Sequence, residues 1–264
     1  MVPKSWWSRV TGVIGRSPEH ARLLLLLLRR EVVGRTSGTW LGGGWLVLQP
    51  ALQVVAFWFL LDVVLKVRSV GQVPFLEYFL TAMISWLFIQ EALSRALTVL
   101  SEYAGLYQRT IFPIGVLPLV PLVMSAVIYT PVMLVVCGWL LGPWAVLKAL
   151  ALMGWLCLVL VPAVYLFAVA GLFIRETRQV MPFAMTLLMY FSPILYQPES
   201  LPESLRDWMF LNPLADLIIL QQQWLLESPG SWPGLVRGAA IWAVSLPLAV
   251  WLFRRAIPHM REAL

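Results

Sequence analysis

The sequence predicts an all-α integral membrane protein with six transmembrane helices, and three observations lead to this fold class. The 264-residue chain is 60% hydrophobic and only 12% charged, whereas soluble domains carry about 25% charged residues. Six apolar blocks are long enough to cross a hydrocarbon core about 30 Å thick, which takes roughly 20 helical residues. The longest blocks exceed the length of a barrel strand, and a spanning segment must satisfy its backbone internally, so helices are expected.

The predicted spans follow one another with short connections, so residues 1–264 are expected to form a single membrane domain without a soluble module. The run Leu23–Leu28 does not read as a secretory signal peptide, because it has only six apolar residues and Arg29 follows at once. The six spans cover residues 45–65, 75–93, 114–141, 145–173, 180–196 and 235–253.

The distribution of lysine and arginine predicts the orientation in the membrane. An even number of spans places both termini on one side, and 14 of the 19 basic residues lie in segments on that side; the other five are Lys66, Arg68, Lys148, Arg206 and Arg237. Cytoplasmic segments carry such an excess, so both termini are expected in the cytoplasm. The net charge of +6 reflects this bias, and nucleic acid is not expected as a partner.

Residues 19–35 are expected to form an amphipathic helix at the cytoplasmic membrane surface. The segment is too short and too basic to span, and it would place leucines at the acyl boundary and arginines near anionic headgroups. A plain basic flank of the first span is the alternative. Inside that span, Gln49 and Gln53 are costly in lipid and should face protein or a cavity.

Two connections are long enough to have their own structure. Residues 94–113, on the cytoplasmic side, show helical spacing of apolar residues and suit docking on a partner, although a linker without a partner is an alternative. Just before them, Glu91 and Arg95 have the i, i+4 spacing that supports a helix end. Residues 197–234, on the outer side, hold five acids and two short amphipathic segments, which favours a re-entrant or interfacial hairpin over a seventh span.

No motif for catalysis or nucleotide binding occurs in the sequence. The chain lacks the G-x-x-x-x-G-K-[ST] loop that cradles nucleotide phosphates. Its two histidines lie near opposite ends, and acids deep in the spans, which an ion relay would need, are missing. Cys137 and Cys157 fall inside predicted spans and are expected to pack as small apolar residues. No metal site and no enzyme activity are therefore predicted.

Aromatic residues are abundant, with 14 Trp, 7 Tyr and 12 Phe. Many fit the belts at the two membrane interfaces. Others lie within the spans, where lipid contact or packing is the ordinary role. A second possibility is a conduit whose flat, amphipathic rings stack on the apolar faces of sugars.

Five short motifs occur in order between the predicted spans. They are Arg35, Leu41, Gly42, Trp45 and Pro50; Ser94, Arg95 and Ala96 with Phe112 and Pro113; Phe173–Arg178; Phe191–Tyr196; and Asn212, Pro213 and Leu214. This order resembles that of permease subunits of ABC-2 type polysaccharide exporters, which move lipid-linked O-antigen, capsule or teichoic-acid chains. The third motif departs from the family pattern F-F-R-D-x-R, because Ile174 and Glu176 replace its second Phe and its Asp. The resemblance runs from about residue 22 to 257.

The resemblance implies a homodimer in the bacterial inner membrane, bound to two copies of a separate ATPase that holds ATP and Mg²⁺, with no cofactor in this chain. It implies that residues 94–113 couple to the ATPase, with candidate residues Arg95, Glu102, Tyr103, Arg109, Arg175, Glu176 and Arg178. The first and fifth spans would line the path, with sugar-contact candidates Phe57, Trp58, Tyr190, Phe191 and Tyr196. Residues 197–234 would form an outer gate, with candidates Asn212 and Pro213.

Three other functions remain open on the sequence. An ABC-2 permease for a lipid or drug would share the architecture. A membrane-embedded transferase acting on lipid-linked sugars would need clustered acids or a histidine near a membrane face. A non-catalytic assembly subunit would stimulate no ATPase.

Overall fold

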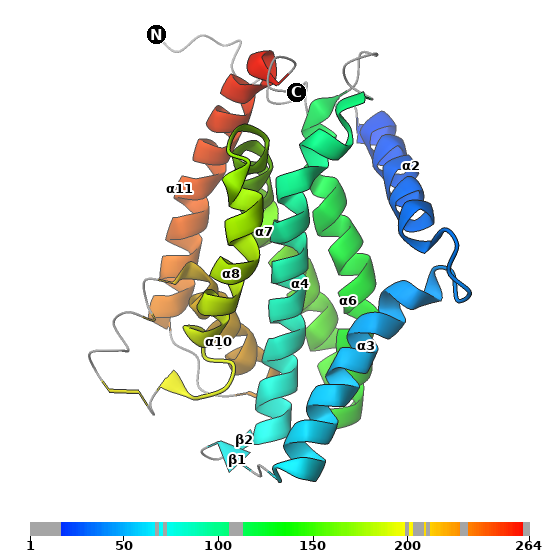
Figure 1. Ribbon diagram of the computed structural model, residues 1–264. Helices are drawn as coiled ribbons and strands as arrows, with labels where there is room; N and C mark the ends of the chain where they lie inside the picture. The colour runs from blue at the N-terminus through cyan, green and yellow to red at the C-terminus, as the bar shows by residue number, and fades with distance from the viewer. Residues whose placement is uncertain are drawn as a thin grey trace.

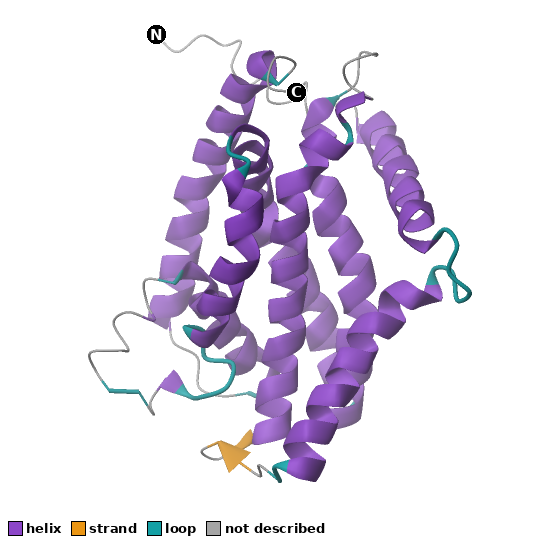
Figure 2. Ribbon diagram, viewed as in Figure 1, coloured by secondary structure: helices purple, strands orange, loops and turns teal. Residues whose placement is uncertain are grey.

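The computed structural model describes residues 17–66, 69–70, 73–105, 113–198, 201–202, 209, 212–227 and 232–260. In this part of the chain the fold is almost wholly helical (Figure 2). The one sheet is a short hairpin of β1 (Ser69–Val70) and β2 (Val73–Pro74). The helices are α2 (Ser17–Thr36), α3 (Gly44–Trp58), the π-helix η1 (Phe59–Val64), α4 (Phe75–Glu102), η2 (Ile114–Val116), α6 (Leu119–Leu140), α7 (Pro143–Phe173), α8 (Glu176–Tyr190), α10 (Pro213–Leu225), α11 (Trp232–Ala256) and η4 (Ile257–His259).

The prediction of a helical, multi-pass membrane protein is confirmed. Among the described residues, five helical segments are long and apolar enough to cross a bilayer: Gly44–Val64, Phe75–Glu102, Ile114–Leu140, Pro143–Phe173 and Ala240–His259. The segment predicted as the fifth span differs, because α8 has only 15 residues and ends at Tyr190. Pro193 explains this end, since proline lacks an N–H and disfavours helical geometry at the residue before it.

Helix α4 forms the centre of the bundle. Its side chains from Tyr78 to Ile89 are all buried, and Trp86 and Phe88 are completely inaccessible. Helices α3, α6, α7, α8 and α10 all pack against it. A helix that is apolar on every side is expected in such a central position, so α4 serves as the common support for the surrounding helices.

Helices α6 and α7 run antiparallel behind α4 and are joined by a very short turn (Figure 1). Gly142 allows this turn, because its φ of 90° lies where side-chain-bearing residues are strained. Pro143 then begins α7 at a position where a proline costs no hydrogen bond.

The two ends of the bundle differ in the elements that they carry (Figure 1). The upper end in that view holds the beginning of α2, the end of α4, the α7–α8 turn and the end of α11. The lower end holds the β1–β2 hairpin and the α6–α7 turn. The beginning of α2 and the end of α11 therefore lie toward the same end of the bundle.

The connection predicted over residues 94–113 begins as a continuation of α4. The helix persists to Glu102 because Ala96, Leu97 and Leu100 repeat at helical spacing and are buried. Residues 106–112, which include Arg109, lie outside the described residues.

Candidate functional site

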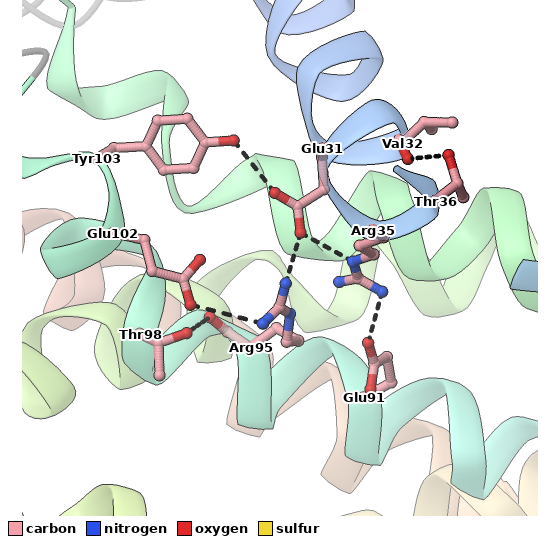
Figure 3. A network of polar contacts seen from close by, with 9 residues as sticks. All are labelled: Glu31, Val32, Arg35, Thr36, Glu91, Arg95, Thr98, Glu102 and Tyr103. Carbon is pink, nitrogen blue, oxygen red and sulfur yellow. Dashed lines mark hydrogen bonds and ion pairs between the residues drawn. The ribbon is translucent and has the colours of Figure 1, made fainter. Parts of the chain in front are cut away.

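A cluster of charged side chains joins α2 to the upper end of α4 (Figure 3). Glu31 lies at its centre: one carboxylate oxygen accepts hydrogen bonds from Arg35 Nε at 2.9 Å and from an Arg95 guanidinium nitrogen at 2.6 Å. Its other oxygen accepts from the Tyr103 hydroxyl at 3.2 Å. We call Glu31, Arg35, Glu91, Arg95, Glu102 and Tyr103 the charged cluster.

The charged cluster is continuous because both arginines bridge two acids. Arg35 also donates to Glu91 at 2.9 Å, and Arg95 lies 3.5 Å from a Glu102 oxygen. Bonds between charged partners are roughly twice as strong as neutral ones. The cluster therefore fastens α2, which otherwise contacts the bundle through leucines such as Leu27, to the last three turns of α4.

The surroundings of Glu31 and Tyr103 shift their pKa values in opposite directions. Burial by itself would raise the pKa of Glu31, but the hydrogen bonds and charges of Arg35 and Arg95 outweigh burial and lower it. Burial, and then the negative charge of Glu31, raise the pKa of Tyr103 to about 12. At neutral pH Glu31 is therefore ionised and Tyr103 is a neutral donor to it, while the Arg30 guanidinium lies 5.2 Å from the centre of the Tyr103 ring.

The α7–α8 turn is fastened to the same end of α4. The Arg178 guanidinium donates to the carbonyl of Gly171 at 2.6 and 3.0 Å and to the Ser101 hydroxyl. Gly171 lies where the α7 and α4 backbones approach closely, because a Cβ on it would lie 2.0 Å from the Leu97 carbonyl oxygen. Helices α2, α4 and α7 and the start of α8 are thus linked at one end of the bundle.

The predicted coupling residues fall into three groups. Arg95, Glu102 and Tyr103 belong to the charged cluster, and Arg178 holds the neighbouring turn. Arg175 and Glu176 are exposed at the start of α8. Arg109 lies outside the described residues.

Sequence reasoning missed Glu31 and Arg35 as members of this site. Glu91 and Arg95 stood out only as a pair within one helix, whereas each of them pairs with a residue of α2. A signal was present, since Glu31 is the one acid in the basic stretch from Arg22 to Arg35. Its partner on α4, however, requires the tertiary structure.

A second cluster of polar side chains lies nearer the lower end, and its members are neutral. The Tyr78 hydroxyl donates to the carbonyls of Pro193 and Tyr196 at 2.9 and 2.8 Å. Gln222 of α10 donates to the Pro193 carbonyl at 3.0 Å, and Gln221 donates to the Thr81 carbonyl at 2.6 Å. We call Tyr78, Ser192, Asn212, Gln221 and Gln222 the neutral cluster; it binds α10 to α4 and to the turn after α8.

Asn212, predicted as a gate residue, is both a helix cap and a member of this cluster. Its side-chain oxygen accepts from the N–H of Leu214 at 3.0 Å and so caps α10, which begins at Pro213. Its amide nitrogen donates to the Ser192 hydroxyl at 3.0 Å and to the Leu188 carbonyl at 3.3 Å. Pro213 takes the first helical position, where its fixed φ suits the helix.

The aromatic residues predicted to contact sugar are divided between inward and outward positions. Phe57 and Trp58 pack edge-on against Phe79 and Trp139, with ring centres 5.3 and 6.3 Å apart. Tyr190 and Phe191 are 56% and 49% exposed at the end of α8. Tyr196 is half-buried and donates to the Tyr190 carbonyl at 2.9 Å.

The exposed faces of the helices differ in polarity. On α6, on α7 from residue 143 to 158, and on α11 from 240 to 251, the exposed residues are all apolar, for example Val135, Leu150 and Val244. On α3 and α8 the exposed faces also include the polar residues Gln49, Gln53, Gln179 and Thr186. An apolar face suits lipid, whereas an amide in hydrocarbon needs a hydrogen-bonding neighbour. The amides of Gln49, Gln53 and Gln179 therefore suit water or protein better than lipid, while the Thr186 hydroxyl already donates to the Pro182 carbonyl at 2.9 Å.

The lower end carries two shallow depressions that share Pro74 and Glu77. One, of about 400 Å³, is lined by Lys148 and Glu227, which form an ion pair between α7 and the end of α10. The hydrogen bond and charge of Lys148 lower the pKa of Glu227. The other, of about 670 Å³, is lined by Asp62 and Lys66. Each is lined by two acids and one lysine, so neither favours an anionic ligand.

Comparison with known proteins identifies relatives along most of the chain. No protein-family profile matches it. It is 26% identical over 242 residues to the O-antigen export system permease protein RfbA of Myxococcus xanthus, which covers 86% of this chain and 91% of the relative. The chain is similar to O-antigen export permeases along most of its length. Two proteins of the same name from Klebsiella pneumoniae are 24% and 22% identical, each over 207 residues, 75% of this chain and 77% of the relative. The predicted resemblance to ABC-2 polysaccharide permeases is confirmed.

Proposed function

We propose that this chain is the channel-forming subunit of an exporter that moves lipid-linked polysaccharide from the cytoplasm across the bacterial inner membrane. The observation that carries the proposal is the similarity to O-antigen export permeases over nearly the whole length of both proteins. The several apolar helices are what such a permease needs. Since the sequence has no phosphate-binding loop, a separate ATPase subunit, holding ATP and Mg²⁺, supplies the energy.

In this proposal the upper end of the bundle faces the cytoplasm. The charge bias supports this orientation, because Arg22, Arg95, Arg178 and Arg254 all belong to elements at that end. Both termini are then cytoplasmic. Helix α8, together with the turn up to Tyr196, completes a sixth crossing, and α10 belongs to a re-entrant or interfacial outer connection.

Two ATPase subunits bind the cytoplasmic ends of a homodimer of this chain. The links at the upper end support a route for the motion: a push on the segment after Tyr103 is passed to α2 through Glu31 and to α8 through Ser101 and Arg178. The polar faces of α3 and α8 line the path between the two copies. Asn212 and Pro213 hold the outer gate, because α10 is anchored through them.

The test is to delete this chain in its own host and to locate the lipid-linked polysaccharide. The expected result is polymer that accumulates inside the cell beneath a bare surface, with export restored by the intact chain. Absence of polymer synthesis would contradict export and indicate a transferase. A normal surface would contradict polysaccharide as the cargo and indicate a lipid or drug.

A second measurement tests the coupling to an ATPase. The ATPase purified with this chain should hydrolyse ATP faster in the complex than alone. Glu31→Ala should uncouple ATP hydrolysis from export, so that hydrolysis continues while export falls. Equal losses of both activities, with the complex intact, would contradict a coupling role for the charged cluster.

A further inference from the structure

The larger of the two depressions at the lower end of the bundle lies at the level where three membrane spans end. Asp62 and Lys66, which line it, lie around the end of the first span, and Glu77 lies at the start of the second. Leu140, which also lines it, is the last residue of the third span. Because the hydrocarbon core ends where the apolar spans end, this depression lies at the level of the lipid headgroups. Its volume of about 670 Å³ is typical of small-molecule sites.

The charged residues of this depression are not paired within the fold. In the neighbouring depression Lys148 and Glu227 neutralise each other in an ion pair. No ion pair, by contrast, joins Asp62, Lys66 or Glu77 to another described residue. Glu77 is half-buried, and a carboxylate in such a place is stabilised by a partner that is positively charged and donates hydrogen bonds. The depression therefore presents two carboxylates and one ammonium group to a ligand.

The backbone beside the depression has two uncommon features. Asp62 belongs to the π-helix η1, and π-helical turns are rare and occur frequently at functional sites. Lys66 has a φ of 51°, in the left-handed region that is costly for a residue with a side chain. Such strained residues persist where the surrounding structure enforces them, and they cluster at ligand sites. Both features lie on the segment that supplies two of the three charges.

The three charges match a headgroup that carries both a phosphate and a primary ammonium. The phosphate can accept from the Lys66 ammonium, and the ligand's ammonium can donate to the carboxylates of Glu77 and Asp62. A choline headgroup matches less well, because its quaternary nitrogen has no N–H to donate. A headgroup with only negative charge would meet two acids without bringing a cation, and the acids would repel it.

The surface around the depression suits a membrane lipid rather than a soluble compound. Val63, Val64 and Leu65, next to Asp62, are exposed and offer an apolar surface to acyl chains. Trp144, which lines the neighbouring depression, is 77% exposed. An exposed tryptophan at the end of a span is typical of the aromatic belt at the membrane interface. Headgroup and acyl chains can therefore be bound together at this place.

We propose that Asp62, Lys66 and Glu77 bind the headgroup of a phospholipid that has a primary ammonium, such as phosphatidylethanolamine. The site holds whatever cargo the protein moves, and in the orientation proposed above it faces the outer leaflet. Among the described residues, none of α8 lines either depression. The bound lipid would brace the end of η1 against the first turn of α4, the central helix of the bundle.

The first experiment compares headgroups on the wild-type chain. The protein, purified in detergent, receives equal amounts of phosphatidylethanolamine, its mono- and dimethylated forms, phosphatidylcholine and phosphatidylglycerol, and native mass spectrometry counts the lipids retained. Retention should fall as each methyl group replaces an N–H. We expect about fivefold more phosphatidylethanolamine than phosphatidylcholine, the effect of one charge-assisted hydrogen bond at a partly exposed site. Equal retention of these two lipids, or strongest retention of phosphatidylglycerol, would overturn the proposal.

The second experiment assigns the preference to residues. Glu77→Gln keeps the shape of the side chain and should bring the ratio of retained phosphatidylethanolamine to phosphatidylcholine close to one. Lys66→Asn suits a positive φ and removes the partner of the phosphate, so it should lower the retention of both lipids and leave their ratio unchanged. The matched control Glu176→Gln changes an exposed acid at the other end of the bundle and should retain lipid as the wild type does. A wild-type ratio in Glu77→Gln would place the lipid elsewhere and overturn the proposal.

Three other occupants of the depression are distinguished by the same measurement. Loss of the ethanolamine preference in EDTA would assign the acids to a divalent cation. Displacement of the lipid by an equal concentration of free O-phosphoethanolamine would assign the site to a soluble compound. Loss of the dimer in Glu77→Gln, measured by chemical cross-linking in membranes, would assign the depression to a second copy of the chain. Each of these results would overturn the proposal, whereas a preference that survives EDTA and the free headgroup, with an undiminished dimer, supports it.

Discussion

The charged cluster at the upper end and the neutral cluster below it hold helices together by different means. In the charged cluster ionised side chains bind one another, and the exposed fractions of Glu31, Arg95 and Glu102 are 13%, 34% and 43%. In the neutral cluster amides and hydroxyls mainly bind backbone carbonyls, and Asn212, Gln221 and Gln222 are at most 5% exposed. The difference follows from the dielectric environment of each cluster.

Each type of contact suits the burial of its cluster. A partly exposed ion pair is weakened by water, salt and pH, so the link between α2 and α4 can be altered by conditions or by a partner. A buried neutral hydrogen bond is costly to leave unmade, so α10 is held firmly. The upper end is therefore suited to movement, and the region around α10 is suited to rigid support.

The largest effect is expected from a change in the packing beneath the charged cluster. Gly171→Ala places a methyl group 2.0 Å from the Leu97 carbonyl oxygen, so α7 must move away from α4. We expect the free energy of unfolding to fall by about 3 kcal/mol, measured by thermal unfolding of the purified protein in detergent. Gly154→Ala on the same helix is the control, because nothing lies within 4 Å of that Cβ. Equal stability of the two variants would contradict the close approach.

The next effect concerns the neutral cluster. Asn212→Ala removes the cap of α10 and the bonds to Ser192 and Leu188, and should cost about 2 kcal/mol of stability. Asn212→Asp keeps an acceptor for the Leu214 N–H but loses the donor, so it separates the two contributions. Stability near that of the wild type for the aspartate variant would show that the cap alone matters and that the buried bonds add nothing.

A smaller effect is expected for one ion pair of the charged cluster. A double-mutant cycle of Glu31→Gln and Arg95→Gln should give a coupling energy of about 1 kcal/mol, and 1 M salt should reduce it. The matched control is Glu176→Gln, which changes an exposed acid at the start of α8. A coupling energy that salt leaves unchanged would mean that the cluster is as buried as the neutral one.

Much of the fold follows from apolar periodicity, but the two clusters do not. The long blocks predicted the spans now seen in α3, α4, α6 and α7, because lipid solubility acts on each block separately. The end of α8 was misjudged because the apolar run continues through Ile194 and Leu195 past the proline that stops the helix. The continuation of α4 to Glu102 depends on packing of Leu97 and Leu100, which hydropathy alone does not reveal.

The site was predictable only in part, for a related reason. Asn212-Pro213 has the local pattern of a helix start, so its position could be read from the sequence. Glu31, which pairs with Arg95, lies 64 residues before it in the chain. A single sequence does not specify such a pairing. The packing of Phe57 and Trp58 likewise depends on Phe79 and Trp139, which lie on other helices, and the role of the exposed Tyr190 and Phe191 stays a prediction.

The smallest expected effect is a change in how stability depends on pH, and it is absent at neutral pH. It distinguishes the charged cluster, which contains Glu31 and Tyr103, from the neutral cluster. The pKa of Glu31 is lower in the folded protein than its ordinary value of 4.5, so its stabilisation is complete above that value and is lost as the pH falls through the folded pKa. The pKa of Tyr103 is raised from 10 to about 12, so its contribution is complete below pH 10 and is lost as the pH rises toward 12. Glu31→Gln should therefore remove part of the acid decline in melting temperature, and Tyr103→Phe part of the alkaline decline. Asn212→Ala should leave both declines as steep as in the wild type, because the bonds that it removes join Asn212 to Leu214, Ser192 and Leu188, none of which has an ionisable side chain; a change in either decline would show that the clusters are coupled.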